Sequence, residues 1–255
     1  MKVAVVQHDI VWEDKPANFA RLAPMVASAA GTGARLVVLS ETFSTGFSMR
    51  TDEIAEPEGG PSSQFLVAQA AEHGVWVCGS CPEVGDGSGP GGRLRNTLVL
   101  AGPDGTVHRY RKIHRFAYGG EDRSFDAGGQ RVTVEVEGLR LSLFVCYDLR
   151  FADDWWVLAP HTDAYVCVAN WPEARRAHWS ALLRARAIEN QAYVIACNRV
   201  GTGGKLDYAG DSAIVDPLGE ALATGSRTEA LLVADVTAER VAEVRAALPF
   251  LADRR

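Results

Sequence analysis

Short apolar runs, each bounded by polar or turn-forming residues, recur along this chain. Runs of about five to eight residues that are rich in Val, Ile and Leu are too short for helices and predict buried β-strands. We expect such strands at Val3–Gln7, Arg35–Ser40, Val75–Gly79, Ala164–Ala169, Gln191–Asn198 and Leu231–Val236. They are spread over the whole chain, with longer segments between them.

Several of the longer segments carry apolar residues at helical spacing. They predict helices over Pro16–Ala30, Ser62–His73, Arg175–Asn190 and from Ala238 to about Leu248. Pro16 suits the first turn of a helix, and Gly74 suits the position just after one ends. The arginines between Arg175 and Arg186 are interleaved with apolar residues, so we interpret them as the solvated face of a helix.

Three further pairs of short runs are joined by turn-forming residues and predict β-hairpins. The flanking strands are expected at Thr97–Ala101 and Thr106–Arg111, at Val132–Val136 and Arg140–Val145, and at Ser212–Val215 and Ala221–Thr224. Hairpins require antiparallel pairing, whereas strand–helix–strand stretches pack helices on a sheet. The combination predicts an α/β fold with mixed sheets. No linker-like segment divides residues 1–255, so we expect a single domain.

Composition and charge restrict the partners that this chain can bind. It has 255 residues, of which 47% are hydrophobic, and a formal net charge of −6. Binding to nucleic acid or to an anionic membrane favours a basic face, so neither partner is expected. The run at Val3–Gln7 is too short for a signal peptide, and no segment reaches the length of a membrane span. We therefore expect a cytoplasmic protein whose five cysteines are thiols.

Three of the predicted strands end in a residue that can take part in catalysis. Glu41 and Lys112 each follow a strand expected above, and Cys146 closes the apolar run that starts at Leu141. If these ends meet at one edge of a sheet, they place a carboxylate, a cation and a nucleophile together. Each residue taken alone is more often structural, and spacing by itself leaves their convergence open.

Three segments resemble motifs of the nitrilase, or carbon–nitrogen hydrolase, superfamily in their order and spacing. They are Leu39–Phe43, Arg109–His114 and Phe144–Phe151. The resemblance begins at Val3 and covers nearly the whole chain. It implies a four-layer α–β–β–α sandwich that commonly forms a homodimer, and a reaction that needs no metal and no organic cofactor.

The resemblance also implies a role for each candidate catalytic residue. Glu41 would act as general base and acid, Lys112 would stabilise an oxyanion, and Cys146 would be the nucleophile. Glu121 matches a second glutamate of the family, which positions the lysine and the substrate. The backbone N–H of Tyr147 is expected to help bind the oxyanion.

Trp171 and Arg150 complete the set of candidate substrate-binding residues. Trp171 follows a predicted strand, so it could wall a pocket or pack in the core. Arg150 could bind a substrate carboxylate, although an ion pair with the neighbouring Asp148 is the interpretation we favour.

The second half of the chain resembles one branch of the family, the bacterial ω-amidases. The matching segments are Ala169–Pro172, His178–Leu183, Arg186–Tyr193 and Cys197–Arg199. These enzymes hydrolyse the terminal amide of 2-oxo dicarboxylic acid monoamides such as 2-oxoglutaramate or 2-oxosuccinamate. We therefore expect hydrolysis of a small-molecule amide through a Cys thioester, with release of ammonia.

Three alternatives stay open. An N-carbamoyl amino-acid hydrolase or another aliphatic amidase would use the same residues on a different substrate. A catalytically silent relative would serve as a binding module. Cys78 and Cys81 have the spacing of a redox pair, but they trail a strand and open no helix, so a thiol-redox protein is the remotest alternative.

Overall fold

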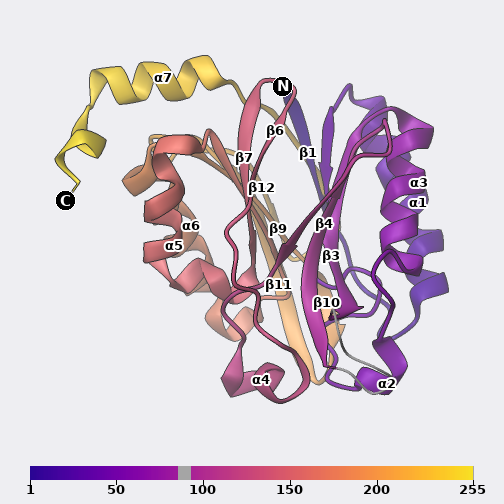
Figure 1. Ribbon diagram of the computed structural model, residues 1–255. Coiled ribbons are helices and arrows are strands. Elements are labelled where there is room, and N and C mark those ends of the chain that lie inside the picture. Colours follow the sequence, from indigo (N-terminus) through magenta and orange to yellow (C-terminus); the bar gives the residue numbers. More distant parts are fainter. Residues whose placement is uncertain (86–92, 255) are drawn as a thin grey trace.

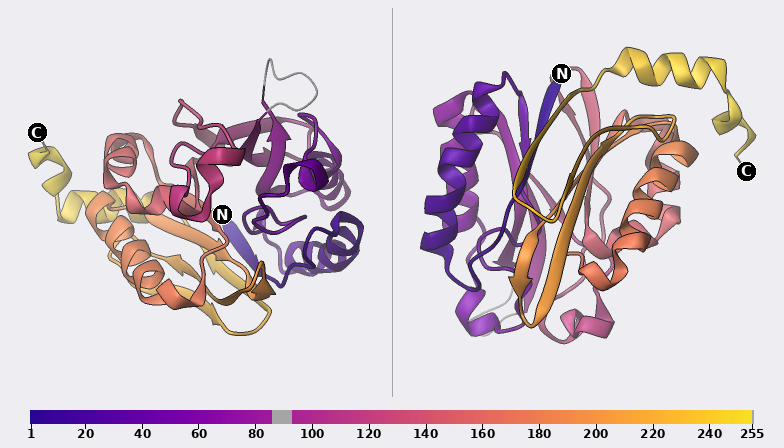
Figure 2. Two further views of the ribbon diagram at one scale, coloured as in Figure 1. Left: turned by 90° about the horizontal axis from the view of Figure 1, so that it is seen from below. Right: turned by 180° about the vertical axis from the view of Figure 1, so that it is seen from behind.

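Two β-sheets lie face to face between two layers of helices in the computed structural model, which describes residues 1–85 and 93–254 (Figure 1). Helices α1 (Lys15–Gly31) and α3 (Pro61–His73) cover the outer face of one sheet. Helices α5 (Ala152–Leu158) and α6 (Arg176–Asn190) cover the outer face of the other. The predicted α–β–β–α sandwich with mixed sheets is confirmed, and Figure 2 shows its layers from behind.

Each sheet combines parallel and antiparallel strands. The first has the order β13–β1–β2–β3–β4–β5, and the second has the order β10–β11–β9–β8–β7–β6 with β12 paired to β11. The first sheet contains β1 (Lys2–Gln7), β2 (Leu36–Val38), β3 (Trp76–Val84), β4 (Leu94–Ala101), β5 (Val107–Arg111) and β13 (Ala230–Asp235). The second contains β6 (Thr133–Val136), β7 (Leu139–Val145), β8 (Ala164–Ala169), β9 (Tyr193–Asn198), β10 (Val200–Gly203), β11 (Leu206–Val215) and β12 (Ala221–Ser226). The remaining α-helices are α2 (Thr51–Ile54), α4 (Glu121–Ser124) and α7 (Ala238–Ala247).

The side chains of β1 show how the apolar runs build the hydrophobic cores. Successive residues of a strand point to opposite faces of its sheet. Val3 and Val5 therefore pack between the two sheets, whereas Ala4 and Val6 pack in the core beneath α1 and α3. All four side chains are fully buried, which explains why this strand is an uninterrupted apolar run. A further core lies between the second sheet and α5 and α6.

The strand directions bring the candidate residues to one edge of the sandwich. Strands β1, β2 and β3 run parallel, and β5 runs in the same direction after the antiparallel strand β4. In the second sheet, β7, β8 and β9 run parallel. Strands β2, β5 and β7, which precede Glu41, Lys112 and Cys146, all end at the edge near α2 and α4 (Figure 1). Ligands of open α/β sheets bind at the carboxyl ends of the strands.

Strand β3 runs on to Val84 instead of ending at Gly79, and this separates Cys78 from Cys81. Residues three positions apart in a strand point to opposite faces of the sheet. The Cys78 side chain lies in the core between the sheets, and Cys81 lies in the core beneath α1 and α3. Both are buried free thiols. The pair that a thiol-redox protein requires therefore points into two different cores.

The C-terminal arm consists of α7 and the 3-10 turn Phe250–Asp253, and it extends past the α5 and α6 layer (Figure 2). Arg245 anchors it, because its guanidinium donates to the carbonyls of Ala159 at 2.9 Å and Thr162 at 2.8 Å. In the part of the chain that the structure describes, no helix is both long and apolar enough to cross a membrane.

Gly128 holds the backbone of Lys112 in place. The Gly128 N–H donates to the Lys112 carbonyl at 2.8 Å. A Cβ at this position would lie only 2.0 Å from the Arg111 carbonyl oxygen. Only glycine allows so close an approach to the end of β5.

We expect Gly128→Ala to lower the free energy of unfolding by about 1–3 kcal/mol, because the added methyl group displaces the end of β5. Gly129→Ala is the matched control, since nothing lies within 4 Å of a Cβ built there. Equilibrium urea unfolding compares the two variants. Equal stability of the two would contradict the close-approach argument.

Candidate active site

Glu41, Lys112 and Cys146 meet at the carboxyl edge of the sandwich. Lys112 directly follows β5, Cys146 directly follows β7, and Glu41 lies just beyond β2. Lys112 Nζ lies 3.0 Å from Glu41 Oε1, and Glu41 and Cys146 line the same cavity. The structure therefore brings together the residues whose convergence the spacing left open.

Lys112 is a buried ammonium group held between two carboxylates. Its Nζ donates to Glu41 Oε1 at 3.0 Å and to Glu121 Oε2 at 2.9 Å. All three side chains are at most 1% exposed. Burial by itself lowers the pKa of Lys112, but the charges of Glu121 and Glu41 outweigh it and hold this pKa well above its usual value. Lys112 is therefore a permanent cation at neutral pH.

Glu121 connects the charged group to the loop that borders it. It opens helix α4 and is fully buried. Beside its ion pair with Lys112, its Oε2 accepts the Phe116 N–H at 2.5 Å, and its Oε1 accepts from Asn96 Nδ2 at 3.2 Å. The position of Lys112 is thereby tied to the backbone of residues 113–120.

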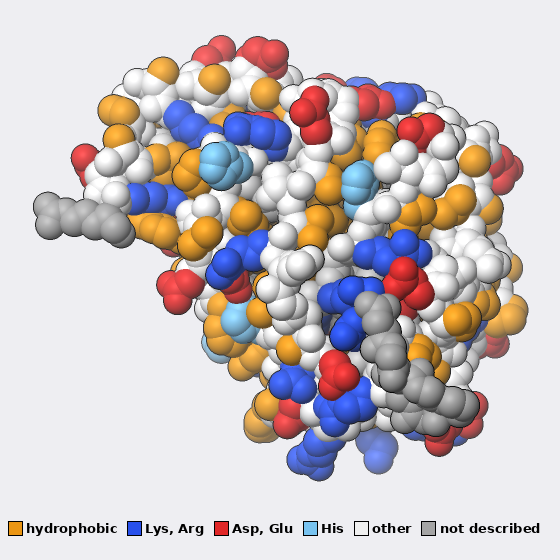
Figure 3. Space-filling view, viewed as in Figure 1, with side chains coloured by type: hydrophobic (Ala, Val, Ile, Leu, Met, Phe, Trp, Pro, Cys, Tyr) orange, Lys and Arg blue, Asp and Glu red, His pale blue; other side chains and the backbone are white. Residues whose placement is uncertain are grey.

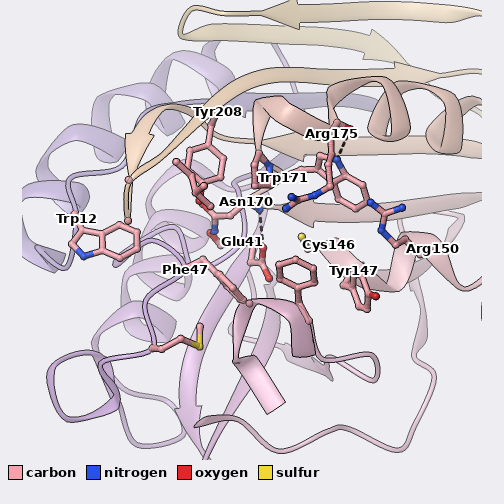
Figure 4. Close-up of a pocket in the computed structure, with 17 residues that line it drawn as sticks. Trp12, Glu41, Phe47, Cys146, Tyr147, Arg150, Asn170, Trp171, Arg175 and Tyr208 are labelled. Carbon is pink, nitrogen blue, oxygen red and sulfur yellow. Dashed lines mark hydrogen bonds between the residues drawn. The ribbon is translucent and has the colours of Figure 1, made fainter. Parts of the chain in front are cut away.

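Two asparagines that the motifs did not single out hold the Glu41 carboxylate. Asn96, on β4, donates to Glu41 Oε1 at 2.8 Å, and the Asn170 backbone N–H donates to Oε2 at 2.7 Å. The Asn170 side chain also donates to the Glu41 carbonyl at 2.6 Å (Figure 4). Because Asn170 directly follows β8, these bonds join the two sheets at the site. Its position at a strand end, next to Trp171, is the sequence signal that could have identified it.

Cys146 opens a 3-10 turn, Cys146–Arg150, with a positive φ of 47°. This left-handed conformation is strained for a residue with a Cβ, and strain of this kind concentrates at functional sites. Burial raises the pKa of the Cys146 thiol well above its usual value, the charge of Glu41 raises it further, and Lys112 opposes both. The thiol is therefore protonated at neutral pH and needs a base, and the Glu41 carboxylate lines the same cavity.

Asp148 stabilises the turn that carries the Cys146 thiol, and it forms no ion pair with Arg150. Its buried carboxylate accepts the Val145 N–H at 3.0 Å, the Tyr110 hydroxyl at 2.8 Å and the His114 N–H at 2.8 Å. The expected ion pair between Arg150 and Asp148 is therefore wrong. These three uncharged donors come from different segments and already surround the Asp148 carboxylate. It therefore stabilises the turn without an ion pair to Arg150.

A cavity of about 290 Å³ opens beside the thiol, with mainly aromatic and apolar walls (Figure 4). Trp12 and Tyr208 lie on one side of Cys146, and Tyr147 and Arg150 lie on the other. Apolar walls with a few polar groups are typical of a small-molecule site. Among the described residues, no group of three or more His, Cys, Asp and Glu side chains is arranged to hold a metal ion.

All three candidate substrate-binding residues, Tyr147, Trp171 and Arg150, line this cavity. Trp171 is also 3% exposed, so it belongs to the cavity wall and to the core at once. The Arg150 Cζ lies 4.6 Å from the centre of the Trp171 ring, and its guanidinium donates to His178 Nδ1 at 3.3 Å. These contacts replace the ion pair expected for Arg150.

The interpretation of the arginines between Arg175 and Arg186 as a solvated face is wrong at both ends of the stretch. Arg175 lines the cavity. Arg186 is buried and donates to the Leu149 carbonyl at 2.7 Å. Helical spacing identifies one face of a helix, but it does not show what that face contacts.

Known proteins resemble this chain in sequence and in fold. The model of the carbon–nitrogen hydrolase family matches residues 2–246. The omega-amidase YafV of Escherichia coli (strain K12) is 37% identical over 258 residues, covering 99% of this chain and 96% of that protein. The 2-oxoglutaramate amidase of Bacillus subtilis (strain 168) is 34% identical over 259 residues, covering 99% and 97%. The crystal structure of XC1258 from Xanthomonas campestris, a CN-hydrolase superfamily protein with an arsenic adduct in its active site, matches with a TM-score of 0.93 and 37% identity, covering 100% of this chain and 97% of that one.

Lys112→Met removes the charge that two buried carboxylates require. We expect this variant to lose about 3–5 kcal/mol of unfolding free energy, because Glu41 and Glu121 are left without a cation. Adding Glu121→Gln should restore part of the loss, since it removes one of the two charges and keeps an acceptor for the Phe116 N–H. Urea unfolding of the wild type, both single variants and the double variant measures this coupling. A double variant no more stable than Lys112→Met would contradict the charge argument.

Proposed function

Because the chain belongs to the carbon–nitrogen hydrolase family, we propose that it is an ω-amidase that acts on 2-oxo dicarboxylic acid monoamides such as 2-oxoglutaramate or 2-oxosuccinamate. The observation that carries the proposal is the buried ion pair of Glu41 and Lys112, with Glu41 and the Cys146 thiol lining one cavity of small-molecule size. The similarity to an omega-amidase and a 2-oxoglutaramate amidase, over 99% of this chain, supports this choice of substrate.

The proposed reaction passes through a thioester on Cys146. Glu41 takes the thiol proton, and the sulfur attacks the amide carbon to form a tetrahedral oxyanion. Glu41 then gives the proton to the nitrogen, the carbon–nitrogen bond breaks, and ammonia leaves. A water molecule, deprotonated by Glu41, attacks the thioester; the carboxylic acid leaves and the sulfur regains its proton.

Lys112 and the turn after β7 would stabilise the oxyanion. The charge of Lys112 is fixed in position before the substrate arrives, because Glu41 and Glu121 hold its ammonium from two sides. Preorganised charge of this kind lowers the barrier without reorganisation during the reaction. The backbone N–H of Tyr147, the residue after the nucleophile, is the second proposed donor. Glu121 acts through Lys112 and is a positioning residue.

Two other functions compete with this proposal. An N-carbamoyl amino-acid hydrolase, or another aliphatic amidase, would use the same Glu41, Lys112 and Cys146 and would differ only in the substrate. A catalytically silent binding module would not need a nucleophile, a base and a cation at one edge of the sandwich. The arrangement of these residues therefore favours an enzyme.

We also propose a cytoplasmic homodimer that pairs through the α5 and α6 layer and the C-terminal arm. Hydrophobic side chains are exposed on this side of the molecule (Figure 3). They include Val157 (55% exposed) on α5 and Leu248 (48% exposed) after α7. The arm and α5 are adjacent, because Arg254 donates to the Trp156 carbonyl at 3.0 Å. Exposed apolar patches of this kind favour association with another protein surface.

Ammonia release from the purified protein tests the reaction. The panel contains 2-oxoglutaramate, 2-oxosuccinamate, glutamine, an N-carbamoyl amino acid and a simple nitrile. We expect release from the two oxo-amides alone. Cys146→Ala should reduce turnover by at least about 1,000-fold, because no other group can form the thioester, with little change in stability.

Each other result points to a different function. Ammonia release from the N-carbamoyl amino acid alone would support the proposed mechanism but would contradict the proposed substrate. If the wild type releases ammonia from none of these compounds, the result would favour the binding module. Full activity in Cys146→Ala would contradict the thioester route.

Sedimentation equilibrium tests the homodimer. Val157→Asp places a charge in the proposed interface, so we expect it to shift the dimer toward the monomer. Leu222→Asp is the matched control, because Leu222 is 46% exposed but lies on β12, outside the proposed interface. Dissociation by the control and not by Val157→Asp would place the interface elsewhere, and a monomeric wild type would rule out a dimer.

A further inference from the structure

The charge of the catalytic group opposes the proposed substrate. Glu41 and Glu121 carry two formal negative charges against the single positive charge of Lys112, so the buried group is net negative. An amide that also carries a carboxylate is repelled by this group unless positive charge nearby compensates. The cavity wall must therefore supply a cation if the protein selects monoamides of dicarboxylic acids.

Two guanidinium groups line the cavity, and one of them is already engaged. Arg150 lies over the Trp171 ring and donates to His178, as described above. Arg175 lies over the Phe116 ring, with its Cζ 5.4 Å from the ring centre. Within residues 1–85 and 93–254, no group accepts a hydrogen bond from the Arg175 guanidinium. Its donors are therefore available to a ligand in the cavity.

The backbone of Arg175 is held firmly although its guanidinium lacks an acceptor. Its carbonyl accepts from Trp171 Nε1 at 2.8 Å. The next residue, Arg176, donates from two nitrogens to the Asp211 carboxylate, at 2.8 Å each. The Arg175 side chain therefore projects from a backbone that is already fixed. This reduces the conformational entropy that is lost when the side chain binds a ligand.

We propose that Arg175 binds the carboxylate of the substrate while the amide lies at Cys146, and that this contact selects monoamides of dicarboxylic acids over neutral amides. The inference rests on the proposed ω-amidase function and identifies the residue that sets its specificity. A guanidinium presents paired donors that match a carboxylate, and the half-buried, aromatic surroundings strengthen such a pair relative to one in water.

The neighbours of Arg175 fit this role. The Phe116 ring beneath the guanidinium excludes water from one side of the proposed pair. Arg150 adds a second positive charge to the same cavity, and one of its nitrogens donates to His178. The two cations together offset the negative charge of the catalytic group for an anionic substrate.

Steady-state kinetics with 2-oxoglutaramate tests the role of Arg175. We expect Arg175→Met to raise KM by about 10- to 100-fold with a much smaller change in kcat, because the lost contact is made equally in the ground state and the transition state. Arg175→Lys keeps the charge without the paired donors, so its KM should be intermediate. Added NaCl should raise KM of the wild type more steeply than KM of Arg175→Met, because salt screens the carboxylate–guanidinium attraction.

Arg184→Met is the matched control, because it removes the same charge from the exposed side of α6, outside the cavity lining, and sedimentation equilibrium checks that it keeps the oligomeric state of the wild type. We expect its KM and its salt dependence to equal those of the wild type. If the wild type hydrolyses 2-oxoglutaramate and Arg175→Met has the same KM as Arg184→Met, the role of Arg175 is wrong while the proposed function stands. If the wild type hydrolyses neither oxo-amide, the proposed function is wrong, and the carboxylate role of Arg175 is withdrawn with it.

Discussion

Lys112 brings a full positive charge into the interior of the protein, and the arrangement of the site depends on how that charge is paired. An isolated buried ammonium group is strongly unfavourable, whereas one held between carboxylates is tolerated. Glu41 follows β2 and Glu121 lies on α4. Their ion pairs with Lys112 Nζ therefore hold together segments that are distant in sequence. Loss of Lys112 would leave two buried carboxylates without a cation, which couples the stability of this edge to its chemistry.

The same charges determine how the thiol can react. Two carboxylates against one ammonium leave the group net negative, and burial together with Glu41 keeps the Cys146 thiol protonated. The site is therefore not built around a preformed thiolate. In the proposed reaction, proton transfer to Glu41 accompanies attack by the sulfur, and the hydrogen bonds from Asn96 and Asn170 hold the Glu41 carboxylate in position for it.

Features that depend on local pattern could be predicted from the sequence, and features that depend on how the two sheets meet could not. The helix expected at Ser62–His73 is observed at Pro61–His73, because an amphipathic helix with a glycine stop has a local signature. The bonds between Asn170 and Glu41 join residues 129 positions apart and exist only once the sheets have packed. Helix α5 was not predicted, because its seven residues are too few to show a clear helical period. Family resemblance supplied what the pattern could not, namely that three strand ends converge.

One chain of contacts connects the cavity wall to Lys112. The Arg175 guanidinium lies over the Phe116 ring, the Phe116 N–H is held by Glu121, and Glu121 pairs with Lys112. The residue proposed to recognise the substrate and the residue proposed to stabilise the oxyanion therefore share one supporting loop. Because the backbones of both residues are held in place, a substrate whose amide and carboxylate are wrongly spaced can satisfy one of them but not both. Chain length of the substrate, as well as its charge, then becomes a property that this site can select.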